Sequence, residues 1–386
     1  MKSPIIVIAD DLTGAAEIAG IGLRYGLNVE ILTTLNLDFQ ADLVVISANT
    51  RSLSALEAQE KTRILAEQIA KTKPQFIFKK IDSVLRGHIL TEINEILTKN
   101  PFEKTLILPA NPSLGRTIIE GKYFVNGISI EETSFANDPE FAIRDANVLS
   151  MIRAENNEVK FIKPAEKVSQ NGIFICEASS KQDVDFWASV LTKDTLLVGA
   201  ADFFDAILAR SFKQQKLEIK ELKPLSDKPK TLYISGTTYQ KSVVAIKEKY
   251  LKNEAVSYLP IKLFIEKPTE FALEKWAKEI LVLFETKPTI IIAIGDLADV
   301  KVLPQQLAKW MSLVVKTVSE KCQIDQFLIE GGATAAAILA TLSYKSFIPT
   351  NEFSQGVICL KPQENQKISI TIKPGSYEWP SKIWQF

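Results

Sequence analysis

Short runs of apolar residues alternate with longer amphipathic stretches through the first half of the chain. The first run is Ile5-Ile6-Val7-Ile8, and similar runs follow at 29–32, 43–47, 76–81, 105–109, 173–176 and 196–199. Continuous apolar runs of this length are typical of strands buried on both faces. The stretches between them have helical periodicity, most clearly at 12–25, 54–71 and 87–99. This alternation predicts an α/β domain with a mostly parallel sheet.

The second half of the chain repeats the pattern. Strands are predicted at 232–235, near Val256, at 290–295 and at 327–330, followed by two tail strands at 357–360 and 368–372. The segment 214–230 is rich in lysine and contains two prolines, which is typical of a linker. Because single cores rarely exceed about 250–300 residues, we expect two domains, 1–213 and 231–386. Asn126-Gly127 between apolar runs predicts a small hairpin arm in the first domain.

Composition and charge narrow the class of protein. Lys and Arg total 46, as do Asp and Glu, so the formal net charge is zero and a nucleic-acid binder is disfavoured. The chain has three widely spaced cysteines and one histidine, His88, which argues against a disulfide framework and multi-histidine metal sites. No apolar run approaches the length of a membrane span, and the start of the chain does not resemble a signal peptide. We expect a cytoplasmic protein without a membrane partner. Whether it forms a homo-oligomer stays open.

Polar clusters follow four predicted strands of the first half. They are Asp10-Asp11, Asn49-Thr50-Arg51, the segment 80–87 and the segment 111–116. Parallel strands place such clusters at one edge of the sheet, where open α/β sheets bind ligands. Their charged members are the acids Asp10, Asp11 and Asp82 and the cations Arg51, Lys80, Arg86 and Arg116. Arginine forks bind carboxylates and carboxylates accept hydroxyl hydrogens, so the set predicts a site for a small, anionic, hydroxylated ligand.

Structural alternatives exist for each of these residues. An aspartate at a helix start is often an N-cap, and an arginine often forms a surface ion pair without function. For His88, a satisfied histidine on a helix face is favoured over a catalytic one.

Small residues occupy two strand-to-helix turns of the second half, at 235–238 and 331–334. Glycine allows the backbone to approach a ligand, and the free N–H groups of a first helical turn attract phosphate oxygens. Two such turns in one domain favour a nucleotide site. The segment 115–122 is one residue too long for a P-loop, and Gly20, Gly22 and Gly26 miss the dinucleotide spacing.

These features together resemble the four-carbon acid sugar kinase family over nearly the whole chain. The matching motifs, in chain order, are Ala-Asp-Asp-Leu-Thr-Gly-Ala at 9–15, Lys-Ile-Asp-Ser-Val-Leu-Arg-Gly at 80–87, Pro-Ala-Asn-Pro-Ser-Leu-Gly-Arg at 109–116, Val-Asn-Gly at 125–127, Ser-Gly at 235–236, Gly-Gly-Ala-Thr at 331–334 and Lys-Pro-Gly at 373–375. The resemblance implies an α/β protein of two domains, each with a mostly parallel sheet flanked by helices, and an active site in the cleft between them. It implies a sugar-acid domain at 1–213 and a nucleotide domain at 231–386.

The resemblance also implies the activity and its residues. The activity is ATP- and Mg²⁺-dependent phosphorylation of threonate, erythronate or 3-oxo-tetronate. We expect Asp10 or Asp11 to orient or deprotonate the hydroxyl, with Asp82 as the second choice. The substrate or the transferring phosphoryl is held by Arg51, Lys80, Ser83, Arg86 and Arg116. ATP is placed on Ser235, Gly236, Thr237, Gly331, Gly332, Ala333, Thr334 and Gly375.

Two single residues and one three-residue run depart from the family pattern. Ala333 replaces an acid, Glu17 replaces Asp, and Asn111-Pro112-Ser113 replaces an aromatic-Pro-acidic run. Two other functions remain compatible with the residues. One is a Mg²⁺-dependent phosphohydrolase in which Asp10 or Asp11 is phosphorylated, and the other is a non-catalytic sugar-acid sensor.

Overall fold

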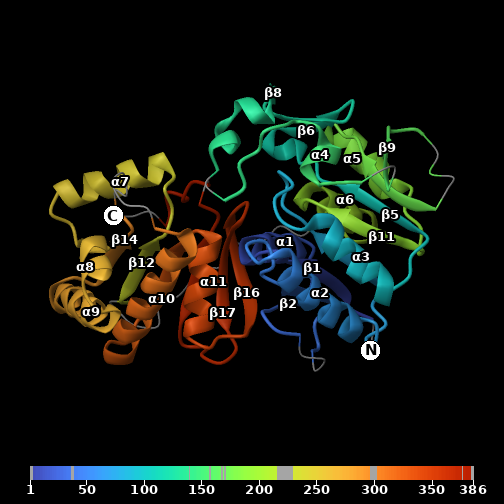
Figure 1. The fold of residues 1–386 in the computed structure, drawn as a ribbon. Helices are drawn as coiled ribbons and strands as arrows, with labels where there is room; N and C mark the ends of the chain where they lie inside the picture. Colours follow the sequence, from blue (N-terminus) through green and yellow to red (C-terminus); the bar gives the residue numbers. More distant parts are fainter. Residues whose placement is uncertain are drawn as a thin grey trace. The chain divides into compact units, whose positions relative to one another are not determined.

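The chain folds into two compact units, Met1–Leu217 and Glu218–Phe386 (Figure 1). The structure is a computed structural model that describes residues 3–35, 39–138, 140–155, 158–166, 168, 171–214, 229–295, 302–375 and 377–383. Most of the predicted linker, 215–228, lies outside the described residues.

The first unit contains a parallel sheet whose strands are ordered β2-β3-β1-β4-β11-β5-β10-β9. Its strands are β1 Ile5–Ala9, β2 Val29–Leu32, β3 Leu43–Ser47, β4 Phe76–Lys80, β5 Lys104–Leu108, β9 Val159–Ile162, β10 Gly172–Cys176 and β11 Thr195–Gly199. All residues of β1, β3 and β11 are buried, as their apolar sequences predict. The sequence pattern missed β9, which is short and includes the exposed Lys160.

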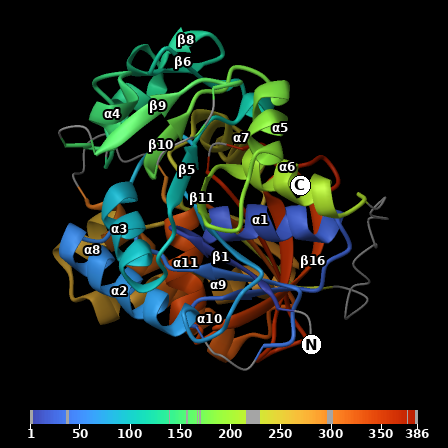
Figure 2. The same ribbon diagram turned by 90° about the vertical axis from the view of Figure 1, so that its right-hand side faces the viewer.

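Helices cover both faces of this sheet. They are α1 Leu12–Arg24, α2 Ala55–Ile69, α3 Ile89–Lys99, α4 Val148–Met151, α5 Lys181–Ser189 and α6 Ala201–Ser211. Figure 2 shows α2 and α3 on one side of the strands and α1, α5 and α6 on the other. Ser54 with Glu57 and Ser180 with Asp183 form capping boxes that fix the starts of α2 and α5.

The predicted hairpin arm is confirmed and has one more strand than expected. Its antiparallel strands are β6 Arg116–Ile119, β7 Lys122–Val125 and β8 Ile128–Ser129. Asn126 and Gly127 have φ angles of 51° and 80°, the left-handed pair that a tight hairpin turn requires. Short 3₁₀ turns follow, η2 Ile130–Glu132 and η3 Ser134–Asn137.

The second unit contains a mixed sheet ordered β13-β14-β12-β15-β18-β17-β16. Its strands are β12 Thr231–Ser235, β13 Val256–Tyr258, β14 Thr289–Ala293, β15 Gln326–Glu330, β16 Ser346–Ser354, β17 Val357–Pro362 and β18 Ser369–Lys373. The first five strands in this order are parallel to one another. β17 runs antiparallel to β18, and β16 runs antiparallel to β17. The sequence pattern missed β16, because it contains Pro349 and two irregularities of register.

Helices and the end of the chain cover this second sheet. The helices are α7 Gln240–Leu251, α8 Ile261–Glu266, α9 Thr269–Thr286, α10 Pro304–Lys321 and α11 Gly332–Thr341. The inward residues Tyr233, Ile291 and Leu328 pack with Ile246 of α7 and with Trp379 near the chain end. Each unit thus has a sheet flanked by helices, and the predicted α/β fold class is confirmed.

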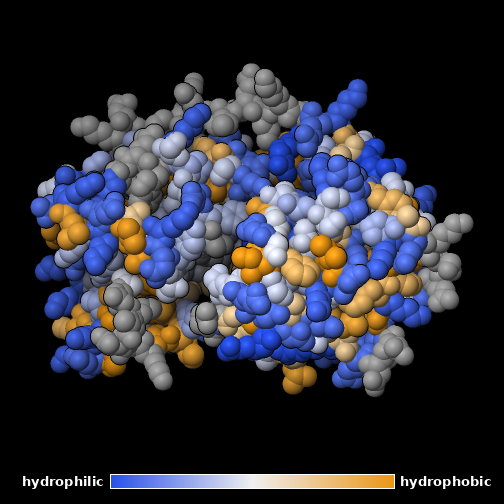
Figure 3. Space-filling model, turned by 90° about the horizontal axis from the view of Figure 1, so that it is seen from above, coloured by the Kyte–Doolittle hydropathy of each residue, from blue (hydrophilic) through white to orange (hydrophobic). Residues whose placement is uncertain are grey.

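The surface mixes hydrophilic and hydrophobic residues on the face drawn in Figure 3. Large apolar side chains are exposed at scattered positions such as Leu56, Leu251 and Leu303, a common finding that by itself indicates no interface. In the part of the chain that the structure describes, no helix is both long and apolar enough to cross a membrane.

Candidate functional site

The acidic pair and the predicted cationic residues meet at one edge of the first sheet. Asp10 directly follows β1, Arg51 follows β3 and Asp82 follows β4, and β3, β1 and β4 are adjacent parallel strands. Asp10, Asp11 and Asp82 are all less than 10% exposed. The prediction that the polar clusters share one edge is therefore confirmed for these strands.

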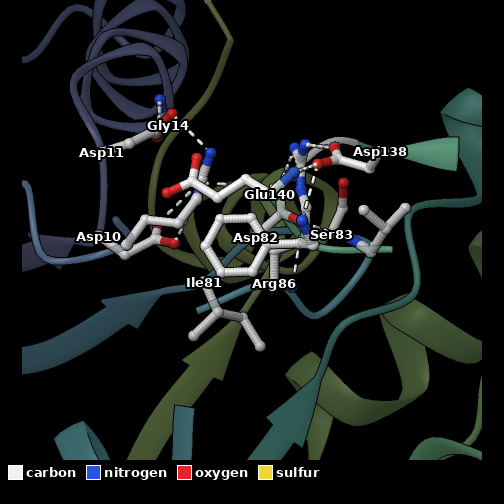
Figure 4. A network of polar contacts seen from close by, with 12 residues as sticks. Asp10, Asp11, Gly14, Ile81, Asp82, Ser83, Arg86, Asp138 and Glu140 are labelled. Carbon is white, nitrogen blue, oxygen red and sulfur yellow. Dashed lines mark hydrogen bonds and ion pairs between the residues drawn. The ribbon is translucent and has the colours of Figure 1, made fainter. Parts of the chain in front are cut away.

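Arg51 is the centre of this cluster. Its Nε and Nη2 atoms donate to the two carboxylate oxygens of Asp10 over 2.8 and 3.0 Å. Its Nη1 atom donates to Asp11 over 2.8 Å, and Nη2 lies 3.6 Å from Asp82. Figure 4 shows the acids gathered in one polar network. One guanidinium thus holds three carboxylates in a fixed arrangement, because its planar fork directs each donor.

Asp11 combines two roles. Its Oδ1 atom accepts from the backbone N–H of Gly14 over 2.7 Å, which caps α1, so the structural alternative holds for this residue. Its Oδ2 atom accepts from Thr13 over 2.7 Å and also from Arg51. Burial raises the pKa of Asp11, but Arg51, Thr13, Lys80 and the Gly14 amide outweigh it, and the net pKa is lowered. Asp11 is therefore an ionised hydrogen-bond acceptor and a weak base at neutral pH.

Asp82 pairs with a second arginine. Arg86 donates through Nε and Nη2 to the two oxygens of Asp82, both over 2.9 Å, and through Nη1 to Asp138 over 3.0 Å. Burial opposes ionisation of Asp82, but Arg86 and Arg51 hold the pKa of its carboxyl well below the usual range. Asp82 also accepts from the backbone N–H groups of Val84 and Arg86, each over 3.2 Å, which closes the loop after β4.

The hairpin arm contacts the same loop. Arg116 at the start of β6 donates to the Ser83 hydroxyl, and the Tyr123 hydroxyl of β7 donates to the Ser83 carbonyl. The guanidinium of Arg116 also lies over the ring of Phe135, 5.8 Å from its centroid. Burial raises the pKa of Tyr123, so it stays a neutral donor. Arg116 is thereby brought to the loop that contains Asp82 and Ser83, as predicted.

Lys80, the last residue of β4, is buried beside α1. Its Nζ donates to the Ile81 carbonyl over 3.0 Å and lies 3.5 Å from Glu17. A Cβ atom at Gly14 would lie 3.4 Å from this Nζ and 2.7 Å from Asp11 Oδ1. Gly14 therefore keeps α1 close to both charges.

Two other sequence candidates have structural partners. His88 contacts the Leu53 carbonyl through Nε2 at 2.7 Å, in line with a satisfied histidine rather than a catalytic one. In the motif that departs from the family pattern, the Ser113 hydroxyl and amide donate to Asp202 over 2.7 and 2.8 Å. Asp202 lies in the first turn of α6, so this motif ties the loop after β5 to the neighbouring helix.

A cavity of about 240 Å³ borders Arg86. Its lining includes the apolar Val84, Phe141 and Ile143 and two exposed arginines, Arg144 and Arg153. Sequence reasoning missed both arginines, since neither follows a predicted strand.

The predicted ATP turns lie at one edge of the second sheet. Gly236 follows β12, Gly331 follows β15 and Gly375 lies shortly after β18, and β12, β15 and β18 are neighbours. A Cβ atom at Gly236 would lie 1.9 Å from the Thr334 hydroxyl, and one at Gly375 would lie 2.7 Å from the Thr237 hydroxyl. Gly236 donates its N–H to the Glu330 carbonyl over 3.1 Å. Glycine is thus required where these turns touch.

Gly331 and Gly332 begin α11. Gly331 has a φ of 104° and is the N-cap of the helix, whose first turn includes Ala333 and Thr334. Thr334 is buried against the Gly236 turn, whereas Ala333 is exposed. The first-turn N–H groups of α11 and the Gly236 turn together form an environment suited to phosphate oxygens.

A cavity of about 410 Å³ adjoins these turns. Ser235 and Thr237 line it at the turn, and the rest of its described lining is mainly apolar and aromatic, including Val243, Ile246, Leu251, Tyr250, Tyr258 and Ile294. The rings of Tyr250 and Tyr258 meet edge to face with centroids 5.4 Å apart. A mostly apolar cavity with polar groups at one end is typical of a small-molecule site.

Beneath the turns lies an ion pair that sequence reasoning did not identify. Glu330 and Lys373 are fully buried, with Lys373 Nζ 2.7 Å from Glu330 Oε1. Tyr233 donates to the other oxygen of Glu330 over 2.5 Å, and Ser242 of α7 also donates to Glu330. A charged residue directly before Gly331 and another shortly before Gly375 are the sequence signal that could have indicated this pair.

A magnesium site is not evident among the acids at these edges. Asp10, Asp11 and Asp82 accept from arginines, and Glu330 accepts from Lys373. Within the described ranges, no group of three or more His, Cys, Asp or Glu residues could hold a metal ion. These residues do not fit a protein-held Mg²⁺, and we derive no step through one.

Comparison with known proteins adds named relatives. The chain is 27% identical to D-threonate kinase of Salmonella typhimurium, over 56% of each chain. It is 28% identical to D-erythronate kinase of Heliobacterium modesticaldum, over 47% of this chain and 42% of that one. The chain therefore spans about half the length of these two relatives. It is also 26% identical to 3-oxo-tetronate kinase of Brucella melitensis, over 96% of this chain and 92% of that protein.

Solved structures show the same fold. A Salmonella typhimurium LT2 protein superimposes with a TM-score of 0.76, at 20% identity, over 98% of this chain and 97% of its own. A Haemophilus influenzae protein superimposes with a TM-score of 0.70, at 20% identity, over 97% of each chain. At this identity the likeness shows the fold alone.

A family model described as "Sugar-binding N-terminal domain" matches residues 5–207, the region that contains the Asp10–Arg51–Asp82 cluster. This match covers more than half of the chain. The three named relatives are described as kinases. The chain therefore belongs to the sugar-binding N-terminal domain family, and the resemblance to the four-carbon acid sugar kinases is confirmed.

Proposed function

We propose that this protein is an ATP-dependent kinase that phosphorylates a hydroxyl of a four-carbon sugar acid. The observation that carries the proposal is the edge cluster of Asp10, Arg51 and Asp82. It presents buried carboxylates, fixed by arginine, at the edge where parallel sheets bind ligands. The names of the kinase relatives support a threonate, an erythronate or a 3-oxo-tetronate as the substrate.

The sugar-acid site would use the cluster in two ways. Asp10 and Asp11 are held by Arg51 and would accept hydrogen bonds from substrate hydroxyls, and Asp82 is the second candidate for this role. The substrate carboxylate or the transferring phosphoryl would be held by Arg51, Lys80, Ser83, Arg86 and Arg116. Since Asp11 and Asp82 have lowered pKa values, they suit orientation of a hydroxyl better than its deprotonation.

ATP would bind to the second unit. Its phosphates would lie on the turns at Ser235–Thr237 and Gly331–Thr334 and near Gly375. The first-turn N–H groups of α11, which have no acceptor within the helix, would bind them. The adjoining cavity with Tyr250 and Tyr258 would take the base, because it is mainly apolar and aromatic. Ala333 is exposed, so backbone contacts at this turn do not need an acidic side chain there.

Phosphoryl transfer through a loose transition state depends mainly on positioning and on neutralisation of charge. Arg51, Arg86 and Arg116 would supply positive charge at the acceptor end. The requirement for Mg²⁺ rests on the family resemblance, and the active site in a cleft between domains stays a prediction.

The phosphohydrolase alternative is less well supported. A nucleophilic aspartate needs a carboxylate oxygen that is free to attack, but both oxygens of Asp10 accept from Arg51 and Asp11 caps α1. A sensor that binds only a sugar acid would not need the three glycine-containing turns of the second unit.

An ADP-release assay tests the proposal. The protein would be given Mg-ATP with D- and L-threonate, D- and L-erythronate and their 3-oxo forms, and with no acceptor as the control. Turnover that requires one of these acids supports a kinase. ADP release without an acceptor would indicate hydrolysis, and ligand binding without ADP release would indicate a sensor.

A further inference from the structure

A second buried ion pair, besides Glu330–Lys373, adjoins the Asp10–Arg51–Asp82 cluster without contacting its charged groups. Lys79 of β4 contacts Glu92 of α3, and the two side chains are 0% and 1% exposed. Removing two charges from water is costly, and such a pair often adds little to stability compared with apolar residues. A role in placing other groups would give a reason for its presence.

Glu92 connects this pair to the cluster through Thr50. The Thr50 hydroxyl, which is fully buried, donates to Glu92 Oε1 over 2.9 Å. The other carboxylate oxygen of Glu92 faces Lys79. Lys79 therefore fixes the carboxylate, and the carboxylate fixes the Thr50 side chain.

The backbone at Thr50 leads directly to Arg51. The N–H groups of Thr50 and Arg51 both donate to the Asp10 carbonyl, over 2.9 and 3.2 Å. The Arg51 side chain then returns to the Asp10 carboxylate. A rotation of the Thr50 backbone would move the Arg51 guanidinium relative to its three acids.

The other side of Arg51 is confined by Gly87. This residue has a φ of 97°, and a Cβ atom there would lie 3.5 Å from Arg51 Cγ. The loop that carries Arg51 is thus confined on one side by Gly87. On the other side, the hydrogen bond from Thr50 to Glu92 fixes it.

We infer that Thr50 and Glu92 are positioning residues for Arg51, and that Glu92 orients the Thr50 hydroxyl by accepting its hydrogen bond. The inference rests on the proposed function, because it assigns Arg51 to the sugar-acid site. Neither residue touches the substrate; both act through the direction of the Arg51 fork.

Two variants at Thr50 test this inference. Thr50→Val removes the hydroxyl, whereas Thr50→Ser keeps it and is the matched control. We expect Thr50→Val to raise the KM for the sugar acid roughly tenfold, the equivalent of about 1.4 kcal/mol, with the KM for ATP unchanged. Thr50→Ser should retain both constants. A Thr50→Val protein with a lower Tm and a wild-type sugar-acid KM would show a merely structural role and overturn the inference.

A second pair of variants keeps the test valid if Thr50→Val does not fold. Lys79→Met with Glu92→Gln removes both charges but leaves an amide oxygen that can accept from Thr50. Lys79→Met with Glu92→Leu removes the charges and the acceptor. The inference expects a raised sugar-acid KM only in the second double variant. Equal KM values in the two would contradict it.

A measurement without turnover separates this inference from the proposed function. The Arg51 Nε–H signal in a ¹⁵N NMR spectrum can be assigned from its loss in Arg51→Lys. We expect its hydrogen exchange to be at least tenfold faster in Thr50→Val than in Thr50→Ser. If the two variants differ in this way but the wild-type protein has no kinase activity, the proposed function alone is refuted. Equal exchange in the two variants would refute the positioning role.

Discussion

The ammonium of Lys373 lies 2.7 Å from the Glu330 carboxylate, and both side chains are completely buried. The two residues end neighbouring strands, β15 and β18, and each is followed by a glycine-containing turn of the proposed nucleotide site. Burial lowers the pKa of Lys373, against the opposing effect of Glu330. The pair connects the strand ends that precede the two turns, and Tyr233 and Ser242 also donate hydrogen bonds to Glu330.

Removal of Lys373 should therefore destabilise the second unit strongly. Lys373→Met leaves the Glu330 carboxylate buried without its cation, and such a change costs about 3–5 kcal/mol. Urea unfolding measures this loss. Lys241→Met is the matched control, because the Lys241–Glu378 pair is exposed and should be worth about 0–1 kcal/mol. Similar losses in the two variants would contradict the importance of the buried pair.

Arg51→Lys should impair the sugar-acid site while leaving ATP binding nearly unchanged. Lysine keeps the charge but lacks the fork that reaches Asp10 and Asp11 together. Loss of a charged hydrogen bond costs about 1.5–3 kcal/mol, so kcat/KM for the sugar acid should fall roughly 10- to 100-fold. Steady-state kinetics with each substrate varied in turn measures this. Arg63→Lys on the exposed face of α2 should have wild-type constants. An unchanged kcat/KM in Arg51→Lys would remove Arg51 from the site.

Gly236→Ala should weaken ATP binding more than sugar-acid binding. The new methyl group would lie 1.9 Å from the Thr334 hydroxyl, so the Gly236 and Gly331 turns would have to separate. We expect the KM for ATP to rise at least tenfold. Gly127→Ala is the comparison, since its Cβ meets nothing within 4 Å and only its φ of 80° is strained. Both variants should lose stability, but a change in ATP KM in Gly127→Ala as large as in Gly236→Ala would argue against the assignment of the turns.

The cavity beside these turns gives a prediction with a neighbouring control. Val243 lines the cavity, whereas Val244 is 52% exposed and does not line it. Val243→Trp should fill part of the 410 Å³ space and lower the affinity for ATP. Val244→Trp should bind ATP as the wild type does. Calorimetric titration with ATP tests both, and equal affinities would place the base elsewhere.

The acid stability of the first unit should depend on Asp82. Burial opposes its ionisation, but Arg86 and Arg51 lower its pKa below the unfolded value of about 3.9. A lowered folded-state pKa stabilises the fold at every pH above the unfolded value, and this contribution is lost as the pH falls below about 4. Between pH 5 and pH 3, the free energy of unfolding should therefore fall less in Asp82→Asn than in the wild type.

Asp185→Asn is the control for this pH dependence, because Asp185 forms an exposed pair with Lys181. Urea unfolding at pH 7, 5, 4 and 3 provides the comparison. The assignment fails if Asp82→Asn loses stability with acid as steeply as Asp185→Asn and the wild type do.

The sequence determined most of the strands, with β9 and β16 as exceptions, and the residue types at the ends of those strands. Apolar runs such as 5–9 and 43–47 are recognisable because strands buried on both faces need continuous apolar residues. Since these strands are parallel, the polar residues that follow them had to share an edge. The location of Asp10, Arg51 and Asp82 at one edge of the sheet is therefore predictable from the amino-acid sequence alone.

Only the tertiary structure decided which charges pair. Arg51 and Asp82 are far apart in the sequence, and their contact depends on the order β3-β1-β4 in the sheet. The same applies to Glu330 with Lys373 and to Thr50 with Glu92. A sequence shows that a residue is charged, but its partner is set by strand order and helix packing, which are non-local. The dual role of Asp11 as a helix cap and an Arg51 partner likewise depends on both elements being in place.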